Sequence, residues 1–300
     1  MKKTVKRIKM SSEDRIFYGF VYTFLILILI IIGYPLIFML SASFSSAEAV
    51  SAGRVFLWPV DISLMGYTAI FETGDVLLGY RNSLFYAVFG TLINLFITLI
   101  AAYPLSRRDL PGKGPLMFLF TFTMIFSGGM IPSYLLVNEL GLMNTIWALL
   151  LPGALSVMNM IITRTFFQNS IPHELLEAAQ IDGCNDFRFF LQIALPLSKA
   201  VIAVITLYYA IAHWNSYFSA FLYITKKELY PLQIFLRNIL IANTFDPAML
   251  LDQDTMEAKQ GLANLMKYSL IVVATVPVLI VYPFVQKHFV KGVMIGSIKG

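Results

Sequence analysis

Residues 174–196 read ELLEAAQIDGCNDFRFFLQIALP and form a polar, partly charged stretch that contains one glycine, Gly183. Uncharged runs long enough to cross a lipid bilayer lie on both sides of this stretch. The segment therefore connects two predicted membrane spans. A polar, helix-like connection is unexpected in so hydrophobic a protein, and its role indicates how the chain is organised.

The composition predicts an all-α membrane protein. Of the 300 residues, 58% are hydrophobic and 13% are charged, whereas soluble domains have roughly 45–50% apolar and about 25% charged residues. The mean hydropathy is +0.75, so polar side chains are too few to cover a water-facing globule. The net charge of +5 is explained by orientation signals beside membrane spans, and no nucleic-acid partner is expected.

Six segments are long and apolar enough to form transmembrane helices, since about 20 apolar residues cross a hydrocarbon core of about 30 Å. They are residues 16–47, with the densest apolar part at 17–40, and then 82–106, 114–138, 140–163, 200–225 and 268–286. The first run has a basic lead, but its apolar core exceeds the about 7–15 residues of a signal peptide. We therefore expect this run to be a retained span.

The positive charges favour one orientation of these six spans. Fifteen of the 22 Lys and Arg residues lie in the N-terminus, in 107–113, in 164–199 and in the C-terminal tail. Cytoplasmic loops are enriched in Lys and Arg, so both termini of this multi-pass cell-membrane protein are predicted to be cytoplasmic. The expected domains are an N-terminal tail at 1–16, a six-span domain at 17–290 with a cytoplasmic elbow at 172–196, and a C-terminal tail at 291–300.

The elbow at 172–196 is predicted to be two short helices joined by a turn. Pro172 suits the first helical position, and Glu174 follows in the first turn, where a carboxylate meets the positive end of the helix dipole. Gly183 is placed to turn the chain. Asn185 or Asp186 can cap a second helix at 187–194, which Pro196 would end. An apolar stripe is expected at Ile171, Leu175 and Ala179. A solvated connector that happens to be helical is the alternative.

The same stretch resembles the EAA loop of ABC importer permeases. The resemblance lies in Glu177-Ala178-Ala179, Gly183, Ile193 and Leu195-Pro196, at the spacing of that motif. It implies a fold of the type I importer permease kind, in which this loop docks on a separate ATPase and passes its motion to the spans. The residues then expected to contact the ATPase are Glu174, Glu177, Ala178, Ala179, Asp182, Gly183 and Phe187.

Further motifs resemble the second membrane subunit of maltose-type carbohydrate importers of bacteria. They are 81–83, 102–107, 141–142, 144–145, Trp214-Asn215 and Pro231-Leu232, and the ending 286–292 with 299–300 resembles the oligosaccharide branch of Gram-positive bacteria. The implied partners are a second homologous permease subunit, two ATPase subunits that hold ATP and Mg, an extracellular solute-binding protein and a carbohydrate. An ABC permease for an amino acid, polyamine or phosphate is the alternative, because the elbow motif is shared by such proteins.

Polar and aromatic residues within the spans are candidates for the substrate path, because polar groups in a bilayer usually face a cavity or a partner helix. The candidates are Tyr209, His213, Trp214, Asn215 and Tyr217 in the fifth segment, Asn159 in the fourth and Tyr134 in the third. Aromatic faces can cover the C–H patches of a sugar, while amides and imidazoles satisfy its hydroxyls. Interhelical hydrogen bonding is the alternative role for Asn215 and His213.

No pattern of catalytic residues appears in the sequence. The three histidines lie in different segments, and HExxH, CxxC and a phosphate-binding loop ending in Gly-Lys-Ser/Thr are absent. We therefore expect a transport subunit, with no metal and no cofactor in this chain, rather than an intramembrane enzyme. A stand-alone secondary transporter would be expected to show internal inverted repeats.

Overall fold

The computed structural model describes residues 11–72, 74–242 and 253–297, and in these residues the backbone forms helices and no strand. The α-helices are α1 (Ser12–Ser43), α2 (Ala47–Ser51), α3 (Met65–Glu72), α4 (Asp75–Ser106), α5 (Lys113–Ile125), α6 (Met130–Glu139), α7 (Trp147–Leu150), α8 (Val157–Ser170), α9 (His173–Ile181), α10 (Asp186–Phe189), α11 (Leu195–Leu197), α12 (Lys199–Trp214), α13 (Phe218–Tyr223), α14 (Leu232–Ala242) and α15 (Gln253–Ser297). A π-helical turn at Phe190–Ala194 precedes α11, and a 3-10 turn at Lys227–Leu229 precedes α14.

The chain divides into two compact units. Unit 1 comprises Met1–Ile70 and Asn243–Val272, and unit 2 comprises Phe71–Ala242 and Val273–Gly300. Boundaries between the two units therefore fall within α3 and within α15. Residues 1–10 of the predicted N-terminal tail, residues 298–300 of the predicted C-terminal tail and residues 243–252 lie outside the described residues.

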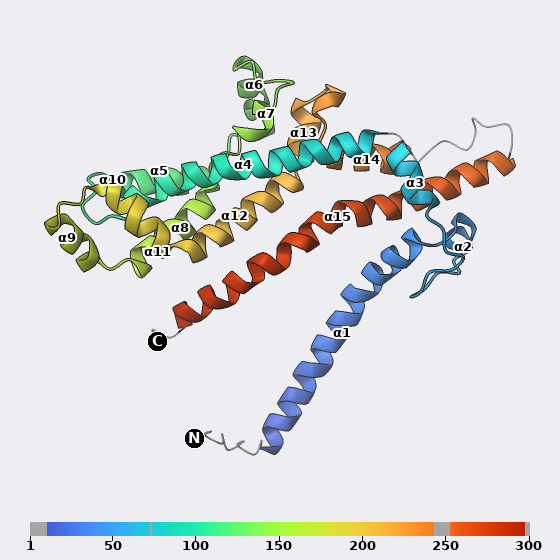
Figure 1. Cartoon of the computed structure of the whole chain (residues 1–300), viewed down its shortest axis with the longest axis horizontal. Helices are drawn as coiled ribbons and strands as arrows, with labels where there is room; N and C mark the ends of the chain where they lie inside the picture. The colour runs from blue at the N-terminus through green and yellow to red at the C-terminus, as the bar shows by residue number, and fades with distance from the viewer. Residues whose placement is uncertain (1–10, 73, 243–252, 298–300) are drawn as a thin grey trace. The chain divides into compact units, whose positions relative to one another are not determined.

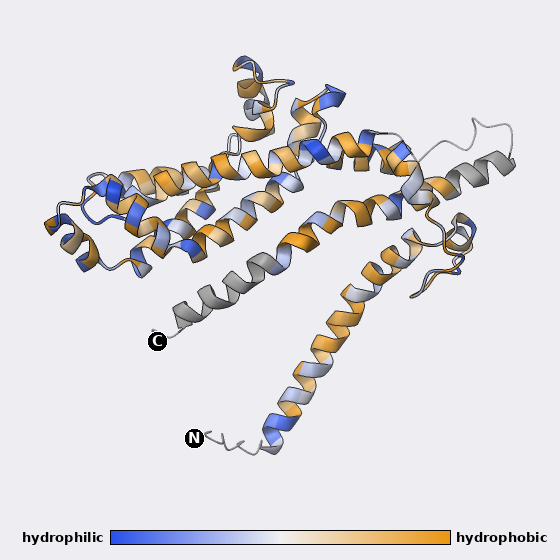
Figure 2. Cartoon of the chain, in the orientation of Figure 1, coloured by the Kyte–Doolittle hydropathy of each residue, from blue (hydrophilic) through white to orange (hydrophobic). Residues whose placement is uncertain are grey.

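Unit 1 contains α1, α2 and the N-terminal part of α15. The side chain of Ser11 caps α1 by accepting from the N–H of Glu13 at 3.2 Å, and hydrophobic residues then follow along the helix (Figure 2). The end of α1 is held within the unit, because the Ser43 carbonyl accepts from the hydroxyl of Ser269 at 3.4 Å and the rings of Phe38 and Tyr268 meet edge to face.

Helix α4 is the central element of unit 2, and α8 and α12 pack beside it (Figure 1). One face of α4 carries polar or small residues at every fourth position: Asn82, Tyr86, Gly90, Asn94 and Thr98. Most of these bond to other segments of unit 2. Asn82 Nδ2 donates to the carbonyls of Glu228 and Tyr230, the Tyr86 hydroxyl donates to the carbonyl of Leu229, and Asn94 Nδ2 donates to the carbonyl of Gly153. Such internal satisfaction is what a bilayer demands of polar groups.

Three described helices are long and apolar enough to cross a membrane, and the number reaches five if each of two bent helix pairs forms one span. The predicted third span at 114–138 is divided, because α5 and α6 are bent by 111°. The break contains Gly129 at φ +85°, a conformation that favours glycine. Nothing lies within 4 Å of a Cβ placed on Gly129, so this glycine contributes its backbone conformation rather than a close helix contact within the described residues.

The predicted fourth span at 140–163 is not one helix. Helix α7 has only four residues, and α8 begins after a turn at 151–156 that contains Pro152 and Gly153. A proline without an N–H group followed by a glycine interrupts the helical hydrogen bonds here. The predicted fifth span at 200–225 is likewise divided between α12 and α13, and the break follows Trp214.

Candidate functional site

The elbow begins with α9, for which Pro172 is the N-cap residue (φ −60°, ψ 143°) rather than the first helical residue. Glu174 lies in the first turn, as predicted, where its carboxylate meets the positive end of the helix dipole. Nδ1 of His173 lies 3.0 Å from Oε1 of Glu177 one turn along the helix. The polar groups at the start of α9 are thus ordered by local contacts.

Gly183 ends α9 in the predicted turn. Its φ is +78°, and its N–H donates to the carbonyl of Gln180 at 3.0 Å while the N–H of Cys184 donates to the carbonyl of Ala179 at 2.9 Å. This pair of bonds is the Schellman arrangement, in which a residue in the left-handed region satisfies the last helix carbonyls. The turn prediction is confirmed.

The second half of the elbow is more continuous than predicted. Asn185 Oδ1 accepts from the N–H of Arg188 at 2.8 Å and so caps α10. The chain then continues through the π-helical turn into α11, which contains Pro196. The prediction that Pro196 ends this helix is wrong: the end comes at Ser198, where the chain bends by 81° into α12. In a regular α-helix the ring of Pro196 would clash with the carbonyl of Gln192, four residues earlier. Gln192 lies in the π-helical turn, where the helix is wider.

The inner face of the elbow packs on the ends of α4 and α8. Leu176, Phe189 and Phe190 are buried in one hydrophobic cluster with residues of both helices. The ring of Tyr103 on α4 lies 4.8 Å from that of Phe190 and 5.9 Å, edge to face, from that of Phe167 on α8. Aromatic pairs of this kind stabilise a contact beyond the area that they bury, so these rings join the elbow to α4.

The predicted apolar stripe of α9 is partly wrong. Ala179 is buried as expected, but its partner is Leu176, which is 5% exposed, whereas Leu175 is 37% exposed. Helix α9 begins at His173, so Ile171 precedes the helix, but its half-buried side chain packs against the same cluster, as expected. The buried pair is then spaced by three residues instead of four.

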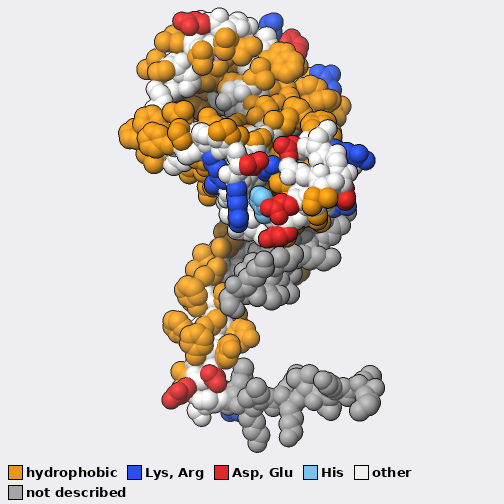
Figure 3. Space-filling model, turned by 90° about the vertical axis from the view of Figure 1, so that its left-hand side faces the viewer, with side chains coloured by type: hydrophobic (Ala, Val, Ile, Leu, Met, Phe, Trp, Pro, Cys, Tyr) orange, Lys and Arg blue, Asp and Glu red, His pale blue; other side chains and the backbone are white. Residues whose placement is uncertain are grey.

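The outer face of the elbow carries the other predicted coupling residues. Glu174, Glu177, Ala178, Asp182, Gly183 and Phe187 are all exposed. Phe187 is 71% exposed, and one more large hydrophobic side chain, Ile181, joins this face at 86% exposure. Ile181 was not among the predicted coupling residues, although an apolar residue between Gln180 and Asp182 was a usable signal. Figure 3 views this end of unit 2, where acidic and basic side chains gather around a histidine.

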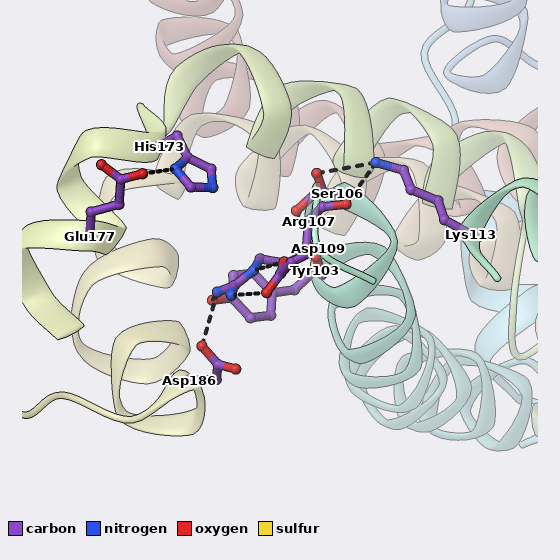
Figure 4. A network of polar contacts seen from close by, with 8 residues as sticks. All are labelled: Tyr103, Ser106, Arg107, Asp109, Lys113, His173, Glu177 and Asp186. Atoms are coloured by element: carbon purple, nitrogen blue, oxygen red, sulfur yellow. Dashed lines mark hydrogen bonds and ion pairs between the residues drawn. The ribbon is translucent and has the colours of Figure 1, made fainter. Parts of the chain in front are cut away.

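An ionic cluster joins the elbow to the end of α4 (Figure 4). Arg107, at the C-cap of α4, binds Asp109 at 2.7 Å and, from the elbow, Asp186 at 3.0 Å. The hydrogen bonds from Arg107 lower the pKa of Asp109 to about 2 from its ordinary 3.8, and the bond to Asp109 raises the pKa of Arg107. Arg107 and Asp109 are therefore drawn together as charged species at neutral pH.

The last carbonyls of α4 are also held by neighbouring side chains. Nζ of Lys113 donates to the carbonyl of Arg107 at 2.8 Å, and Nε of Arg164 on α8 donates to the carbonyl of Leu105 at 2.9 Å. Positive groups at a helix C-terminus stabilise its exposed carbonyls. A cleft of about 180 Å³, lined by residues that include Ser106, Gln168 and Glu174, lies between this end and the start of α9.

Two of the predicted path residues form hydrogen bonds within unit 2, and a third is packed there. The hydroxyl of Tyr209 lies 2.7 Å from that of Thr98 on α4 and accepts from the N–H of Ser156 at 3.1 Å. Nε1 of Trp214 donates to the carbonyl of Ala274 at 3.0 Å. His213 is buried against Gly90, where an added Cβ would lie 2.4 Å from the imidazole ring. These side chains fix α12 against its neighbours.

The remaining predicted path residues are spread over three segments. Asn215 is exposed at the C-cap of α12, and Tyr217 is half-buried with its ring stacked on Phe221 at 6.0 Å. Tyr134 on α6 is half-buried and stacks on Tyr223 at 6.3 Å. Asn159 is buried on α8. Asn215 and Tyr217 therefore lie together, next to Trp214, at the break between α12 and α13.

Metal-ligating side chains are dispersed in the part of the chain that the structure describes. No group of three or more His, Cys, Asp or Glu residues there could hold a metal ion. The ionisable side chains that do gather, around Arg107, make ion pairs with one another.

The chain is similar over its whole length to known transport proteins. It is 45% identical over 291 residues to the polygalacturonan/rhamnogalacturonan transport system permease protein YtcP of Bacillus subtilis (strain 168), a match that covers 96% of this chain and all of that protein. It is 30% identical to the probable ABC transporter permease protein YurM of the same organism, over 93% of this chain and 88% of that one. The chain belongs to the permease subunits of ABC transporters.

A solved structure supports the same assignment for the permease. The crystal structure of a bacterial ABC transporter involved in the import of the acidic polysaccharide alginate contains a chain that matches with a TM-score of 0.84 and 34% identity, covering 94% of this chain and 100% of that one. No family model matches the permease. The permease is thus a bacterial membrane protein and a transport subunit, not itself an enzyme.

Proposed function

We infer that this permease forms part of the translocation path of an ATP-driven sugar importer. The observation that carries this inference is the full-length similarity to a permease for polygalacturonan and rhamnogalacturonan, together with the likeness to a chain of an alginate importer. The permease would act with a second homologous permease subunit, two ATPase subunits and an extracellular solute-binding protein. ATP and Mg would be bound by the ATPase subunits.

The elbow at 172–196 is proposed as the coupling element that the ATPase grips. Its exposed face presents Glu174, Glu177, Ala178, Asp182, Gly183 and Phe187, and we add Ile181 to this set. Ala179, the remaining predicted residue, would act from behind by packing α9 on α4 and α8. A two-sided element of this kind can receive a force on its outer face and pass it to the spans through its inner face.

The membrane topology is proposed to comprise six spans with both termini in the cytoplasm. Helices α1, α4 and α15 would each provide one span, and the bent pair α5–α6 a fourth. The pairs α7–α8 and α12–α13 would provide two further broken spans. The domain limits proposed from the sequence are 1–16, 17–290 and 291–300. Broken helices at membrane depth are tolerated where they line a cavity or contact other protein.

In the proposed mechanism, ATP closes the ATPase dimer, and the elbow moves with it. The end of α4 follows the elbow through Arg107 and Tyr103, and the path changes from inward to outward access. The binding protein then releases sugar into the path. The ATP-bound and ATP-free states must differ in their contacts with the elbow, because a ligand with no differential affinity shifts no population.

The substrate path is proposed to follow the break between α12 and α13. Asn215 and Tyr217 would contact sugar there, with Tyr134 nearby on α6. Tyr209, His213 and Trp214 would position this wall through their internal contacts, and Asn159 would do so from α8.

The test is uptake of labelled oligosaccharides by the complete complex, reconstituted in liposomes with its binding protein. We expect uptake to need ATP, and an Asn215→Ala/Tyr217→Ala variant to take up at least about tenfold less sugar while basal ATP turnover persists. Asn169→Ala, an exposed amide at the elbow end, is the matched control. Normal uptake by the double variant would show that Asn215 and Tyr217 do not contact the sugar. If the wild type took up no saccharide at all, the proposed sugar importer would be refuted.

A further inference from the structure

Arg237 on α14 is half-buried. No carboxylate among the described residues lies within ion-pair distance of it, and its guanidinium carbon lies 4.4 Å from the centre of the Phe221 ring. A guanidinium stacked on a ring keeps the donor N–H groups at its edge free, and these match a carboxylate in two-pronged geometry. The side chain is thus able to accept an anion.

The position of Arg237 is fixed by its helix. The N–H of Leu232, the first residue of α14, donates to Oγ of Ser83 on α4 at 2.9 Å, and the side chains of Leu232 and Phe235 are buried. The two helices approach closely at Gly79, where an added Cβ would lie 2.7 Å from the ring of Phe235. Arg237 therefore projects from a rigid element of unit 2.

The ring under Arg237 belongs to the proposed path. Phe221 is 48% exposed and stacks on Tyr217 with an angle of 20° between the planes, and exposed Asn215 lies two residues before Tyr217. Residues 215–221 and Arg237 thus bring together an exposed amide, two stacked aromatic rings and one cation. Aromatic faces are suited to the apolar C–H side of a sugar ring.

Two other cations near this end of unit 2 are already engaged. Nζ of Lys227 lies 2.8 Å from a carboxylate oxygen of Asp75, and Nη2 of Arg81 donates to Oδ1 of Asn82 at 3.3 Å. Arg237 differs from both because its guanidinium contacts an aromatic ring and has no polar partner among the described residues. Lys226 nearby is exposed to solvent, whereas Arg237 lies over a ring of the proposed path.

We propose that Tyr217, Phe221 and Arg237 form a subsite for the carboxylate-bearing face of a uronic acid residue, so that the cargo of this permease is an acidic oligosaccharide. The inference rests on the proposed function and adds the charge of the substrate to it. The two rings cover the sugar, and the guanidinium binds its carboxylate. A phosphate of an anionic lipid offers similar oxygens, so the test separates the two sources.

The experiment uses the complete complex in liposomes and compares trigalacturonate and trimannuronate with the neutral galactotriose. For the acidic trisaccharide that the wild type imports, Arg237→Gln should raise the half-saturating concentration about tenfold or more. Uptake of the neutral trisaccharide and the ATPase activity stimulated by the binding protein should stay unchanged. The half-saturating concentration of Arg237→Lys should lie between those of the wild type and Arg237→Gln, because a lysine keeps the positive charge but cannot form the two parallel hydrogen bonds of a guanidinium. Arg54→Gln, which removes an exposed arginine paired with Asp61, is the control and should leave uptake unchanged.

Three results would overturn the subsite. The first is that Arg237→Gln imports uronates at the same rate as the wild type does. The second is that the wild type imports only the neutral sugar. Both results would leave the proposed sugar importer itself intact. The loss in Arg237→Gln could also occur in vesicles containing phosphatidylglycerol but not in pure phosphatidylcholine, which would make Arg237 a lipid anchor. Failure of the wild type to import any saccharide would instead refute the proposed function.

Discussion

Gly183 shows how one residue sets the shape of the elbow. At φ +78° it holds the only position between α9 and α10 that is in the left-handed region, and it has no neighbour within 4 Å of a Cβ position. Its role is therefore conformational rather than steric. A side chain here would strain the turn by about 1–2 kcal/mol without meeting any other atom of the chain.

We predict that Gly183→Ala lowers ATPase stimulation in the complete complex severalfold, because the strained turn shifts the exposed face of α9. Gly183→Asn should recover part of the activity, since asparagine adopts left-handed angles more readily than alanine. Coupled ATP turnover measures the effect. Gly114→Ala, at a glycine with open space around it and ordinary φ, is the control. Equal activity of Gly183→Ala and Gly183→Asn would argue against a conformational role.

At the scale of elements, the end of α4 is the point at which the elbow meets the spans. Arg107 reaches both Asp109 and Asp186, and the rings of Tyr103 and Phe190 pack alongside. Ion pairs with an exposed partner contribute at most about 1 kcal/mol, and Asp186 is 64% exposed. The aromatic contact therefore holds the elbow on α4, and the ion pair fixes its angle.

We predict that Arg107→Gln leaves the complex assembled but lowers sugar transport per ATP hydrolysed by severalfold. The ratio of uptake to ATP turnover measures this, and Arg108→Gln, the exposed neighbour, should match the wild type. The pKa of Asp109 is lowered, so its pairing is complete above pH 4 and is lost only as the pH falls toward 2. The transport ratio should accordingly show no titration from this pair between pH 5 and 8. An unchanged ratio in Arg107→Gln would show that the ion pair of Arg107 has no part in coupling.

At the scale of the whole molecule, the sequence predicted what local patterns encode. The apolar runs located α1, α4 and part of α15, and a turn glycine with a capping asparagine located the elbow. Contacts between residues far apart in the sequence could not be predicted. Arg107 and Asp186 are 79 positions apart, and no sequence pattern around either residue indicates that they form a pair. The sequence contains a glycine pair at the break at 127–129, but hydropathy gives no information on the direction of a helix and could not predict a bend of 111°.

The path residues illustrate the same limit. Tyr209 and His213 were selected because polar groups are rare in spans, and the structure shows that both are buried against α4, at Thr98 and Gly90. Composition alone cannot distinguish a polar group that bonds a neighbouring helix from one that faces a path. Asn215 and Tyr217 could be separated from them only once the break after Trp214 was known.

The central claim is that the outer face of the elbow contacts an ATPase subunit. A photo-crosslinking amino acid in place of Ile181, the most exposed large side chain of α9, tests this most directly in the native membrane. We predict a crosslink to the ATPase subunit whose yield changes when ATP is added, and none from the same group in place of Trp58, which is 81% exposed in unit 1. A crosslink to the ATPase from position 58 and none from position 181 would contradict the account.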